Sequence, residues 1–481
     1  MEDKIVGESE MEEGLLRISS SRNSNYVEEV KKIGYIAAPM VAVVLSQYMV
    51  QMISTMMVGH ISELALASSS IAISLSSVTG FSLIMGLGTG LETLCGQAYG
   101  AEQYARLGLY MYKAIFCLVL VCIPITIVWV NLGRILVLLG QDPAISEEAG
   151  RYILWLIPGL FAYAIMQPLM KFLLAQSLIL PMLFSAIITL CIHIPLCWAL
   201  VFMSGMGIQG SALAISMSFW VNVIILGLYI RSSTMCEKTR VPLTLEAFQR
   251  LGEFFKIALP SAVMICLEWW SFELLVLFSG NLPNPQLETS VVSICLMTIS
   301  TLYAFPFGIG SATSTRVSNE LGQGNPLGAR RVAMVALSIT ITVASILSLT
   351  IYFLRDVFGY IFSNEEEVIT YVKKLAPLLS IFLITDGLQG VFSGISRGCG
   401  WQHIGAYVNL GAYYLFGIPI AATLGFWMDL RGLGLWIGIL SGAILQTLFL
   451  TLVTFFTNWQ KQANMAKERF YEDKLEEDPL K

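Results

Sequence analysis

A short stretch that occurs twice decides the fold of this chain. Residues 36–39 (IAAP) open one long apolar segment, and residues 257–260 (IALP) open another one 221 positions later. The motif at residues 86–88 (GLG) returns at residues 308–310 (GIG), 222 positions later, and both copies continue into a polar, glycine-rich stretch. Such constant spacing over most of the chain indicates two copies of one structural plan.

Apolar stretches of membrane-spanning length surround these motifs. A helix needs about 20 predominantly apolar residues to cross the hydrocarbon core. Only 13% of the 481 residues are charged, against about 25% in soluble domains. We therefore predict an all-α polytopic membrane protein with twelve transmembrane helices in two pseudo-symmetric six-helix lobes. The expected spans are 33–58, 66–92, 108–131, 151–178, 180–203, 208–230, 252–280, 288–314, 330–354, 367–396, 402–424 and 430–457.

The repeat also predicts how the chain is divided. Because six is an even number, both copies enter the membrane from the same side, and parallel repeats of this kind build transporters whose site lies between the two halves. The expected parts are a disordered cytosolic amino-terminal tail (1–32), an amino-terminal lobe (33–230), a cytosolic linker (231–251), a carboxyl-terminal lobe (252–457) and a cytosolic carboxyl-terminal tail (458–481). The first part is acidic and serine-rich, a composition typical of disorder.

Lysine and arginine residues set the expected orientation. With twelve spans, nineteen of these residues fall on the side of the two tails and four on the other side. Cytosolic loops carry the excess of positive charge, so both termini should be cytosolic. This orientation fits the plasma membrane and the vacuolar membrane equally well.

Three motifs carry a resemblance to a known family. Residues 91–101 (LETLCGQAYGA) resemble the signature of multidrug and toxic compound extrusion (MATE) carriers in their plant form. Residues 266–273 (CLEWWSFE) are similar to the plant seventh helix, and residues 431–438 (RGLGLWIG) are similar to the plant twelfth helix. The likeness covers roughly residues 30–460. One position departs from many bacterial members, which carry an acid where this chain has Ser54.

The resemblance implies a twelve-helix, two-lobe fold around a central cavity. It also implies export of organic compounds against an inward cation flux. From the acids inside the predicted spans, we expect organic compounds or xenobiotics to leave the cytosol in exchange for protons. We also expect a monomer without a cofactor. Organic cations, flavonoids or other secondary metabolites are the expected substrates. A lipid-linked precursor flippase of related architecture and a non-transporting membrane receptor are the alternatives, and measured solute flux separates all three.

Ionisable residues inside the predicted spans are the candidate site residues, since a charge in the membrane is costly and therefore functional by default. Glu268 of the seventh span and Asp386 of the tenth are the leading candidates for proton coupling and substrate contact. The repeat aligns Glu268 with Gln47 and Asp386 with Gln167. Glutamine has nearly the shape of a protonated glutamate but cannot ionise, so the titratable groups gather in the carboxyl-terminal half.

Further residues are secondary candidates. Glu273 lies about 140° around the helix from Glu268 at 3.6 residues per turn, so a proton site and an interhelical hydrogen bond are both open for it. Lys171 either pairs with a carboxylate or packs in its lobe, and Trp269 offers an aromatic wall. Pro260 and Gly387 are the expected hinges, because proline and glycine sites kink helices.

Three other polar residues are expected to be structural. Glu92, just before the signature loop, should tie helices together rather than carry protons. Glu288 should be a solvated residue at the cavity mouth. His193, in the middle of the fifth span, should make a structural hydrogen bond.

The sequence lacks the motifs and the charge that are typical of other functional classes. The net charge of -5 gives no basic footprint for nucleic acid. There is no P-loop for an ATP-driven pump and no catalytic motif such as HExxH or GxSxG. The nine cysteines contain no CxxC pair and read as small buried residues, so neither disulfides nor a metal site is expected.

Overall fold

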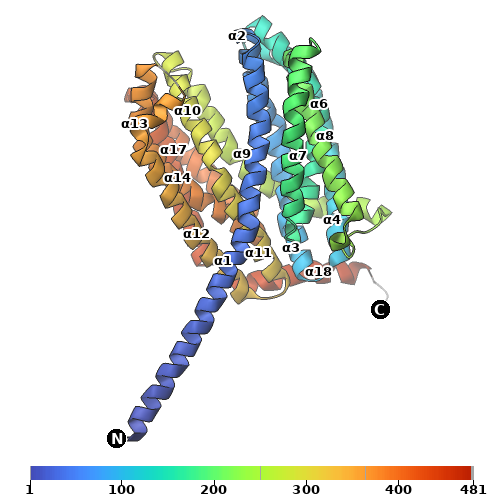
Figure 1. Ribbon diagram of the computed structural model, residues 1–481, viewed down its shortest axis with the longest axis vertical. Coiled ribbons are helices and arrows are strands. Elements are labelled where there is room, and N and C mark those ends of the chain that lie inside the picture. The colour runs from blue at the N-terminus through green and yellow to red at the C-terminus, as the bar shows by residue number, and fades with distance from the viewer. Residues whose placement is uncertain (1, 250, 363–364, 478–481) are drawn as a thin grey trace.

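The computed structural model describes residues 2–249, 251–362 and 365–477, with side chains described from Tyr26 to Arg469 apart from a few positions. Within these residues, twelve helices or helix pairs are long and apolar enough to cross a membrane. Figure 1 shows two bundles that converge near α18 (Trp459–Glu477) and diverge toward the opposite end. The predicted all-α membrane fold with twelve spans is therefore confirmed.

Helices α1 to α8 form the amino lobe. Its elements are α1 (Glu2–Gly59), α2 (Glu63–Ser76), η1 (Ser77–Phe81), α3 (Ser82–Gly100), α4 (Tyr104–Val130), α5 (Leu132–Leu138), α6 (Pro143–Ala175), α7 (Leu180–Trp198), η2 (Ala199–Met203) and α8 (Ile208–Ser232). Two short turns, η3 (Thr234–Cys236) and η4 (Leu245–Phe248), follow in the linker.

The carboxyl lobe comprises helices α9 to α17. Its elements are α9 (Leu251–Ser279), α10 (Pro285–Leu302), α11 (Ala304–Gly322), α12 (Pro326–Phe353), α13 (Arg355–Phe358), η5 (Gly359–Ile361), α14 (Glu366–Cys399), α15 (Gln402–Asn409), η6 (Leu410–Gly417), α16 (Ile418–Ala422), η7 (Thr423–Trp427) and α17 (Arg431–Phe455). Helix α18 follows it and lies beneath the converging ends of both lobes (Figure 1).

Local sequence signals explain where several helices begin. The Asp142 carboxylate accepts hydrogen bonds from the first free amides of α6, and Pro143 stands at the first helical position. Asn325 and Pro326 begin α12 in the same way. Capping side chains and a leading proline are typical helix starts, because the first amides have no partner within the helix.

Three of the spans are interrupted. The eighth divides into α10 and α11 at Tyr303, where Pro306 lacks the amide hydrogen that would bond to the carbonyl of Leu302. The second contains the π-helical segment η1 between α2 and α3, and the eleventh contains η6 and η7. Single-turn π segments occur frequently at functional sites, and η1 contributes Ser77 and Phe81 to the main cavity.

The amino-terminal segment differs from the expectation. Residues 2–32, which we predicted to be disordered, are part of the continuous helix α1. The sequence has no proline before Pro39, and its glutamate, lysine and arginine residues are good helix formers.

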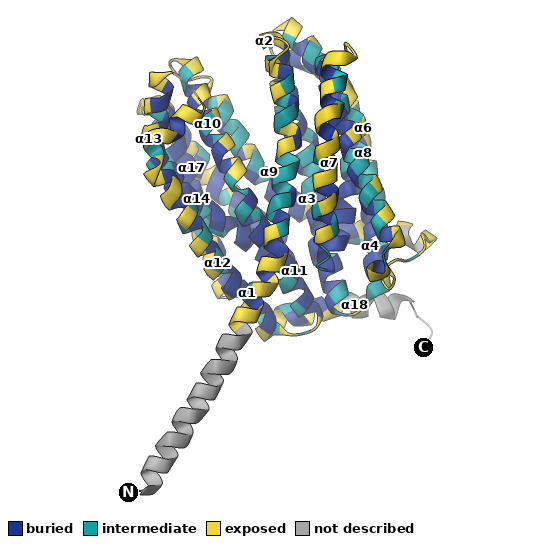
Figure 2. Cartoon of the chain, in the orientation of Figure 1, coloured by how far each residue is buried: buried dark blue, intermediate teal, exposed yellow. Residues whose placement is uncertain are grey.

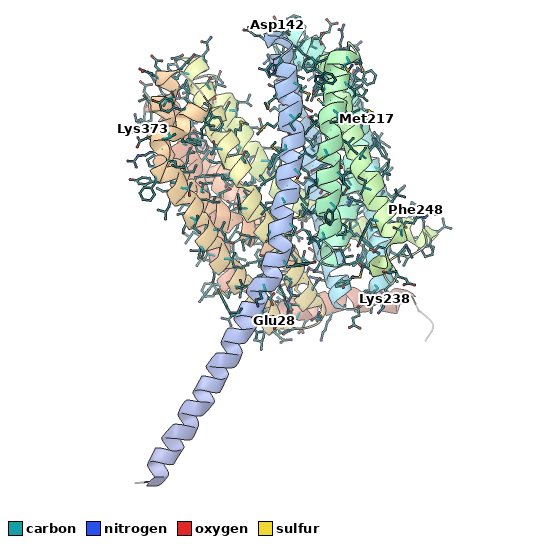
Figure 3. All side chains as sticks on the ribbon, in the orientation of Figure 1. Glu28, Asp142, Met217, Lys238, Phe248 and Lys373 are labelled. Carbon is teal, nitrogen blue, oxygen red and sulfur yellow. The ribbon has the colours of Figure 1, made fainter. Side chains whose placement is uncertain are left out.

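The two ends of the bundles can be followed from labelled residues. Glu28 at the start of the first span and Lys238 of the linker lie at the converging end, whereas Asp142 and Lys373 lie at the diverging end (Figure 3). Exposed residues gather on the outer surfaces of the bundles and buried ones between the helices (Figure 2). Many exposed residues are large and apolar, such as Phe184, Leu228 and Leu415, as expected where lipid is the solvent.

Candidate functional site

A large cavity lies mainly in the amino lobe. It contains about 1200 Å³ of empty space, including the part open to solvent. Only Trp269, Tyr303 and Phe307 of its described lining residues come from the carboxyl lobe. Eight aromatic side chains line it: Tyr48, Phe81, Tyr152, Tyr163, Phe219, Trp269, Tyr303 and Phe307. Such a volume with rigid aromatic walls suits flat organic ligands.

The aromatic walls hold one another in place. The Phe81 ring packs edge-on against Tyr163, with 5.1 Å between ring centroids, and Tyr163 packs against Phe219 at 5.6 Å. Trp269 lines the cavity as expected, whereas its neighbour Trp270 is not among the lining residues. Its indole N–H donates to the carbonyl of Val78 at 3.1 Å instead.

Gln47 and Gln167, the neutral partners of the repeat, both line the cavity. The Gln47 amide lies 3.7 Å from the sulfur of Met170, a weak hydrogen bond that leaves its polar atoms largely free for a ligand. Gln167 lies against Gly88 of α3, where a Cβ atom would come within 3.1 Å of the Gln167 side chain. The glycines of α3 therefore let α6 approach closely enough to place Gln167 in the wall.

Glu268 and Asp386 are both buried in the carboxyl lobe, at 6% and 5% exposure. The Glu268 carboxylate accepts a hydrogen bond from the amide of Gln389 on α14. Asp386 lines a separate, small cavity of about 270 Å³ together with Thr340, Ala344 and Gly387. Neither acid is among the lining residues of the large cavity, and neither forms an ion pair with a described lysine or arginine.

Glu273 makes an interhelical contact. Its carboxylate accepts a hydrogen bond of 2.7 Å from the Ser74 hydroxyl of α2, across the boundary between the lobes. On α9, Cys266 also contacts Ser82 of α3 and Trp270 contacts the Val78 carbonyl of η1, both in the second span. Glu273 was expected to be either a proton site or a partner in an interhelical hydrogen bond. The structure shows the interhelical hydrogen bond.

The proposed hinge residues lie inside unbroken helices. Pro260 is within α9 and Gly387 within α14. A Cβ atom at Gly387 would come within 3.0 Å of Ala344 on α12, so this glycine allows α12 and α14 to pack closely. Bending at either position stays a prediction.

A buried charge cluster joins the two lobes. Glu92 of α3 accepts from the Lys171 ammonium of α6 at 2.6 Å and from the Arg397 guanidinium of α14 at 2.8 Å. All three side chains are 5% exposed or less. The expectations that Glu92 ties helices together and that Lys171 could pair with a carboxylate are confirmed. Arg397 was not a candidate, because it directly follows the predicted tenth span and was counted among the cytosolic charges.

The glycine-rich signature stretch, expected to continue into a loop, instead forms the carboxyl-terminal half of α3 beside this cluster and closes the converging end. The Gln97 amide donates to the Gly398 carbonyl at 3.0 Å, and its oxygen accepts from Arg469 of α18 at 2.7 Å. Thr93 donates to the Arg397 carbonyl. A Cβ atom at Gly100 would collide with the main-chain oxygen of Asn319 in the carboxyl lobe. The small residues of the signature therefore allow the two lobes to meet backbone to backbone.

Two further polar residues were assigned from sequence alone. Glu288, expected to be a solvated mouth residue, is 1% exposed and accepts from the Tyr371 hydroxyl at 2.9 Å and from the Gly432 amide at 3.0 Å. That expectation was wrong, because distant helices supply donors that a local pattern does not reveal. His193 makes the expected structural hydrogen bonds, to Ser218 at 2.8 Å and to Ser54 at 3.0 Å.

Comparisons with known proteins bear on the same regions. The MatE family model matches residues 39–199 and 260–423, one match in each lobe. The chain belongs to the MatE family. Its relatives include Protein DETOXIFICATION 12 of Arabidopsis thaliana, 57% identical with 94% of each chain covered. Protein DETOXIFICATION 10 of the same plant is 55% identical with 95% of each chain covered.

Solved structures of MatE proteins share the fold. The crystal structure of the eukaryotic MATE transporter AtDTX14 matches with a TM-score of 0.90 at 54% identity, over 92% of this chain and 99% of that one. The outward-facing conformation of a multidrug resistance MATE transporter matches with a TM-score of 0.80 at 16% identity, over 92% of this chain and 97% of that one, which bears on the fold alone. This MatE protein is thus a membrane transporter and not an enzyme.

Proposed function

We propose that this transporter is a proton-coupled antiporter that exports organic compounds from the cytosol. The observation that carries the proposal is a pair of buried acids, Glu268 and Asp386, in the lobe beside a large aromatic cavity. Neither acid has an ion-pair partner among the described lysines and arginines. Burial without such a partner disfavours the charged form of a carboxyl group. Two such groups could bind and release protons during a transport cycle.

The pH gradient and the membrane potential together supply enough free energy to drive export of a solute against its gradient. One pH unit across the membrane supplies about 1.4 kcal/mol per proton, and each 100 mV of membrane potential supplies about 2.3 kcal/mol per charge. Proton loading would neutralise the two acids and favour a bent form of α9 and α14, hinged at Pro260 and Gly387. A ligand that loses contacts in this narrowed form would be expelled by its lower affinity for it.

A flux assay tests the proposal directly. The purified chain in proteoliposomes should export at least one member of a panel of organic cations, flavonoids and organic acids when an inward proton gradient is imposed. A sodium gradient of equal size at constant pH should not substitute. Sodium-driven flux without a pH gradient, or no flux with any member of the panel, contradicts the proposal.

The flippase alternative finds less support. A flippase for a lipid-linked diphosphate requires a basic cavity, yet Lys171 is the one charged side chain among the described lining residues and it is already paired with Glu92. Membership of a family of transporters argues against the alternative of a non-transporting receptor. Flux of solutes, rather than of lipid-linked sugars, is the expected outcome.

The proposed orientation places the converging end, both termini and the linker 231–251 in the cytosol, in the plasma membrane or the vacuolar membrane. The charge bias of nineteen to four supports it. Asn281 lies between α9 and α10 and is exposed. A membrane-impermeant maleimide should label Asn281→Cys in right-side-out vesicles. Labelling only after permeabilisation would overturn the orientation.

A further inference from the structure

The linker between the lobes runs along the outer side of helix α4. A Cβ atom at Gly108 of α4 would come within 2.7 Å of the Val241 side chain, and the Tyr112 hydroxyl donates to the Val241 carbonyl at 3.4 Å. The Phe248 ring of η4 packs edge-on against Phe116, with 4.9 Å between ring centroids. Positions 108, 112 and 116 share one face of the helix, because residues four apart are neighbours on its surface. The linker therefore follows this face of α4 for about two turns.

The length of α4 determines how deep this segment reaches into the membrane. Helix α4 contains 27 residues and is about 40 Å long, so it extends beyond a hydrocarbon core of about 30 Å by only about 10 Å in total. Phe116 lies twelve positions after Tyr104, the first residue of α4, which is about 18 Å along the helix axis. The Phe248 ring therefore lies at the depth of the acyl chains, whereas Lys238 lies at the converging end (Figure 3).

The apolar side chains of this part of the linker point away from the protein. Leu243 is 60% exposed and Leu245 is 82% exposed, and Phe248 is exposed as well. On the face of α4 that the linker covers, Leu120 and Ile123 follow Phe116 toward the other end of the helix, and both are exposed. The apolar surface of the linker is thus continuous with a surface of α4 that faces lipid.

Basic residues occupy the part of the linker nearer the converging end. The Arg240 guanidinium donates to the Arg231 carbonyl at the end of α8, and the Lys238 ammonium lies 5.9 Å from the centre of the Tyr104 ring. All three basic side chains are exposed. Residues 231–240 contain one acid, Glu237, so the net charge of this stretch is positive. Basic groups at the membrane surface beside inserted apolar groups are typical of segments that bind anionic lipids.

We infer that residues 231–249 form an interfacial anchor that binds anionic phospholipids of the leaflet beside the converging end. Leu243, Leu245 and Phe248 insert between acyl chains, while Arg231 and Lys238 contact the phosphate groups. In the orientation proposed above this is the cytosolic leaflet, and the inference rests on that orientation for the name of the leaflet alone. The linker keeps its proposed side of the membrane, but its second half lies within the leaflet instead of in water.

The depth of a fluorescent label tests the anchor. The full chain with Cys191→Ser, which removes the exposed cysteine among the described side chains, is labelled with nitrobenzoxadiazole at Leu245→Cys and placed in nanodiscs. Lipids with a spin label high on the acyl chain should quench this fluorescence strongly, and iodide in the buffer should quench it weakly. A label at Glu237→Cys, an exposed position in the same linker, should show the reverse.

Two results of this measurement would overturn the anchor. Strong quenching by iodide at position 245 would place the segment in water. Quenching by neither agent would mean that another protein surface covers it. Both faces of a nanodisc are accessible, so the outcome does not depend on the orientation of the chain in a cell, which the labelling of Asn281→Cys tests separately.

The preference for anionic lipid is tested with the same label. At equal mole fractions, spin-labelled phosphatidylserine should be enriched around Leu245→Cys at least about fivefold over spin-labelled phosphatidylcholine, the factor expected from one basic residue near the leaflet. Arg231→Gln combined with Lys238→Gln should abolish this enrichment. Arg330→Gln combined with Arg331→Gln removes the same charge from exposed positions of α12 and should preserve it. Equal quenching by the two lipids in the unaltered linker, or an equal loss in both double variants, would contradict the inference.

Discussion

The amino and carboxyl lobes follow one plan but carry different chemistry at equivalent positions. Gln47 and Gln167 line the large aromatic cavity of the amino lobe, whereas Glu268 and Asp386 are enclosed within the carboxyl lobe and do not line that cavity. A pair of amides thus lines a cavity of ligand size, and the equivalent pair of acids is buried away from that cavity. On the proposed function, a duplicated bundle separates ligand binding from proton coupling by changing the ionisable character of two helix positions.

The largest expected effect comes from neutralising the acids. Glu268→Gln and Asp386→Asn preserve volume and hydrogen bonding but cannot release a proton. We expect folded protein in which gradient-driven export falls at least a hundredfold, while ligand binding is partly retained. Flux and binding measured at matched amounts of reconstituted protein check this prediction.

Gln47→Ala and Gln167→Ala are the matched controls in the other lobe. They should change affinity or specificity several-fold and leave the dependence of flux on the pH gradient intact. Loss of coupling in the glutamine variants, together with coupling retained in the acid-neutralised ones, would reverse the assignment of tasks to the lobes.

A methyl group at the contact between the lobes should have the next largest effect. Gly100→Ala sets a Cβ atom against the main-chain oxygen of Asn319, which has no flexible side chain to move away. We expect the converging end to be held apart and transport to fall about tenfold. Spin labels at Lys238→Cys and Arg330→Cys, both exposed positions, should report a longer distance.

Gly227→Ala is the control for this substitution. It lies in α8, where an added Cβ atom meets nothing within 4 Å. Transport and the spin-label distance should stay unchanged there. A similar loss in both glycine variants would mean that helix flexibility, rather than contact between the lobes, explains the effect.

The charge cluster predicts a loss of stability. Glu92→Gln leaves Lys171 and Arg397 buried without their carboxylate, and breaking a buried pair typically costs about 3–5 kcal/mol. We expect a clearly lower unfolding temperature in detergent. Glu148→Gln removes one partner of the exposed Arg151 and should cost at most about 1 kcal/mol. Equal decreases in unfolding temperature for the two variants would show that the buried cluster stabilises the fold no more than the exposed ion pair does.

The smallest effect is expected at α18. Arg469→Ala removes the hydrogen bond to Gln97, a loss of about 1 kcal/mol or somewhat more. This should raise the population with a separated converging end by less than about tenfold, seen with the same spin-label pair. Arg469→Lys keeps the charge and should show a smaller change. An unchanged distance distribution in both variants would mean that α18 does not hold the lobes together.

Sequence reasoning reached the spans because twelve long apolar runs depend only on local composition. It singled out Glu268 and Asp386 because an acid in such a run is visible without a structure, and their role in proton coupling stays a prediction. It missed the pairing of Arg397 with Glu92 and the burial of Glu288, because both depend on which distant helices meet. Helix α18 was expected only as a tail, since its many charged residues are typical of solvated segments and its two buried alanines, Ala463 and Ala466, give a weak signal.

The placement of the ligand cavity and the buried acids in different lobes bears on how such proteins diversify. Mutations around Tyr163 or Phe219 can alter which compounds are accepted without touching Glu268 or Asp386. On the proposed division of roles, gene duplicates can acquire new substrate preferences while they keep the same proton-coupling residues. Exchanging the residues that line the cavity between two paralogues should therefore transfer substrate preference, and each recipient should keep its own dependence on the pH gradient.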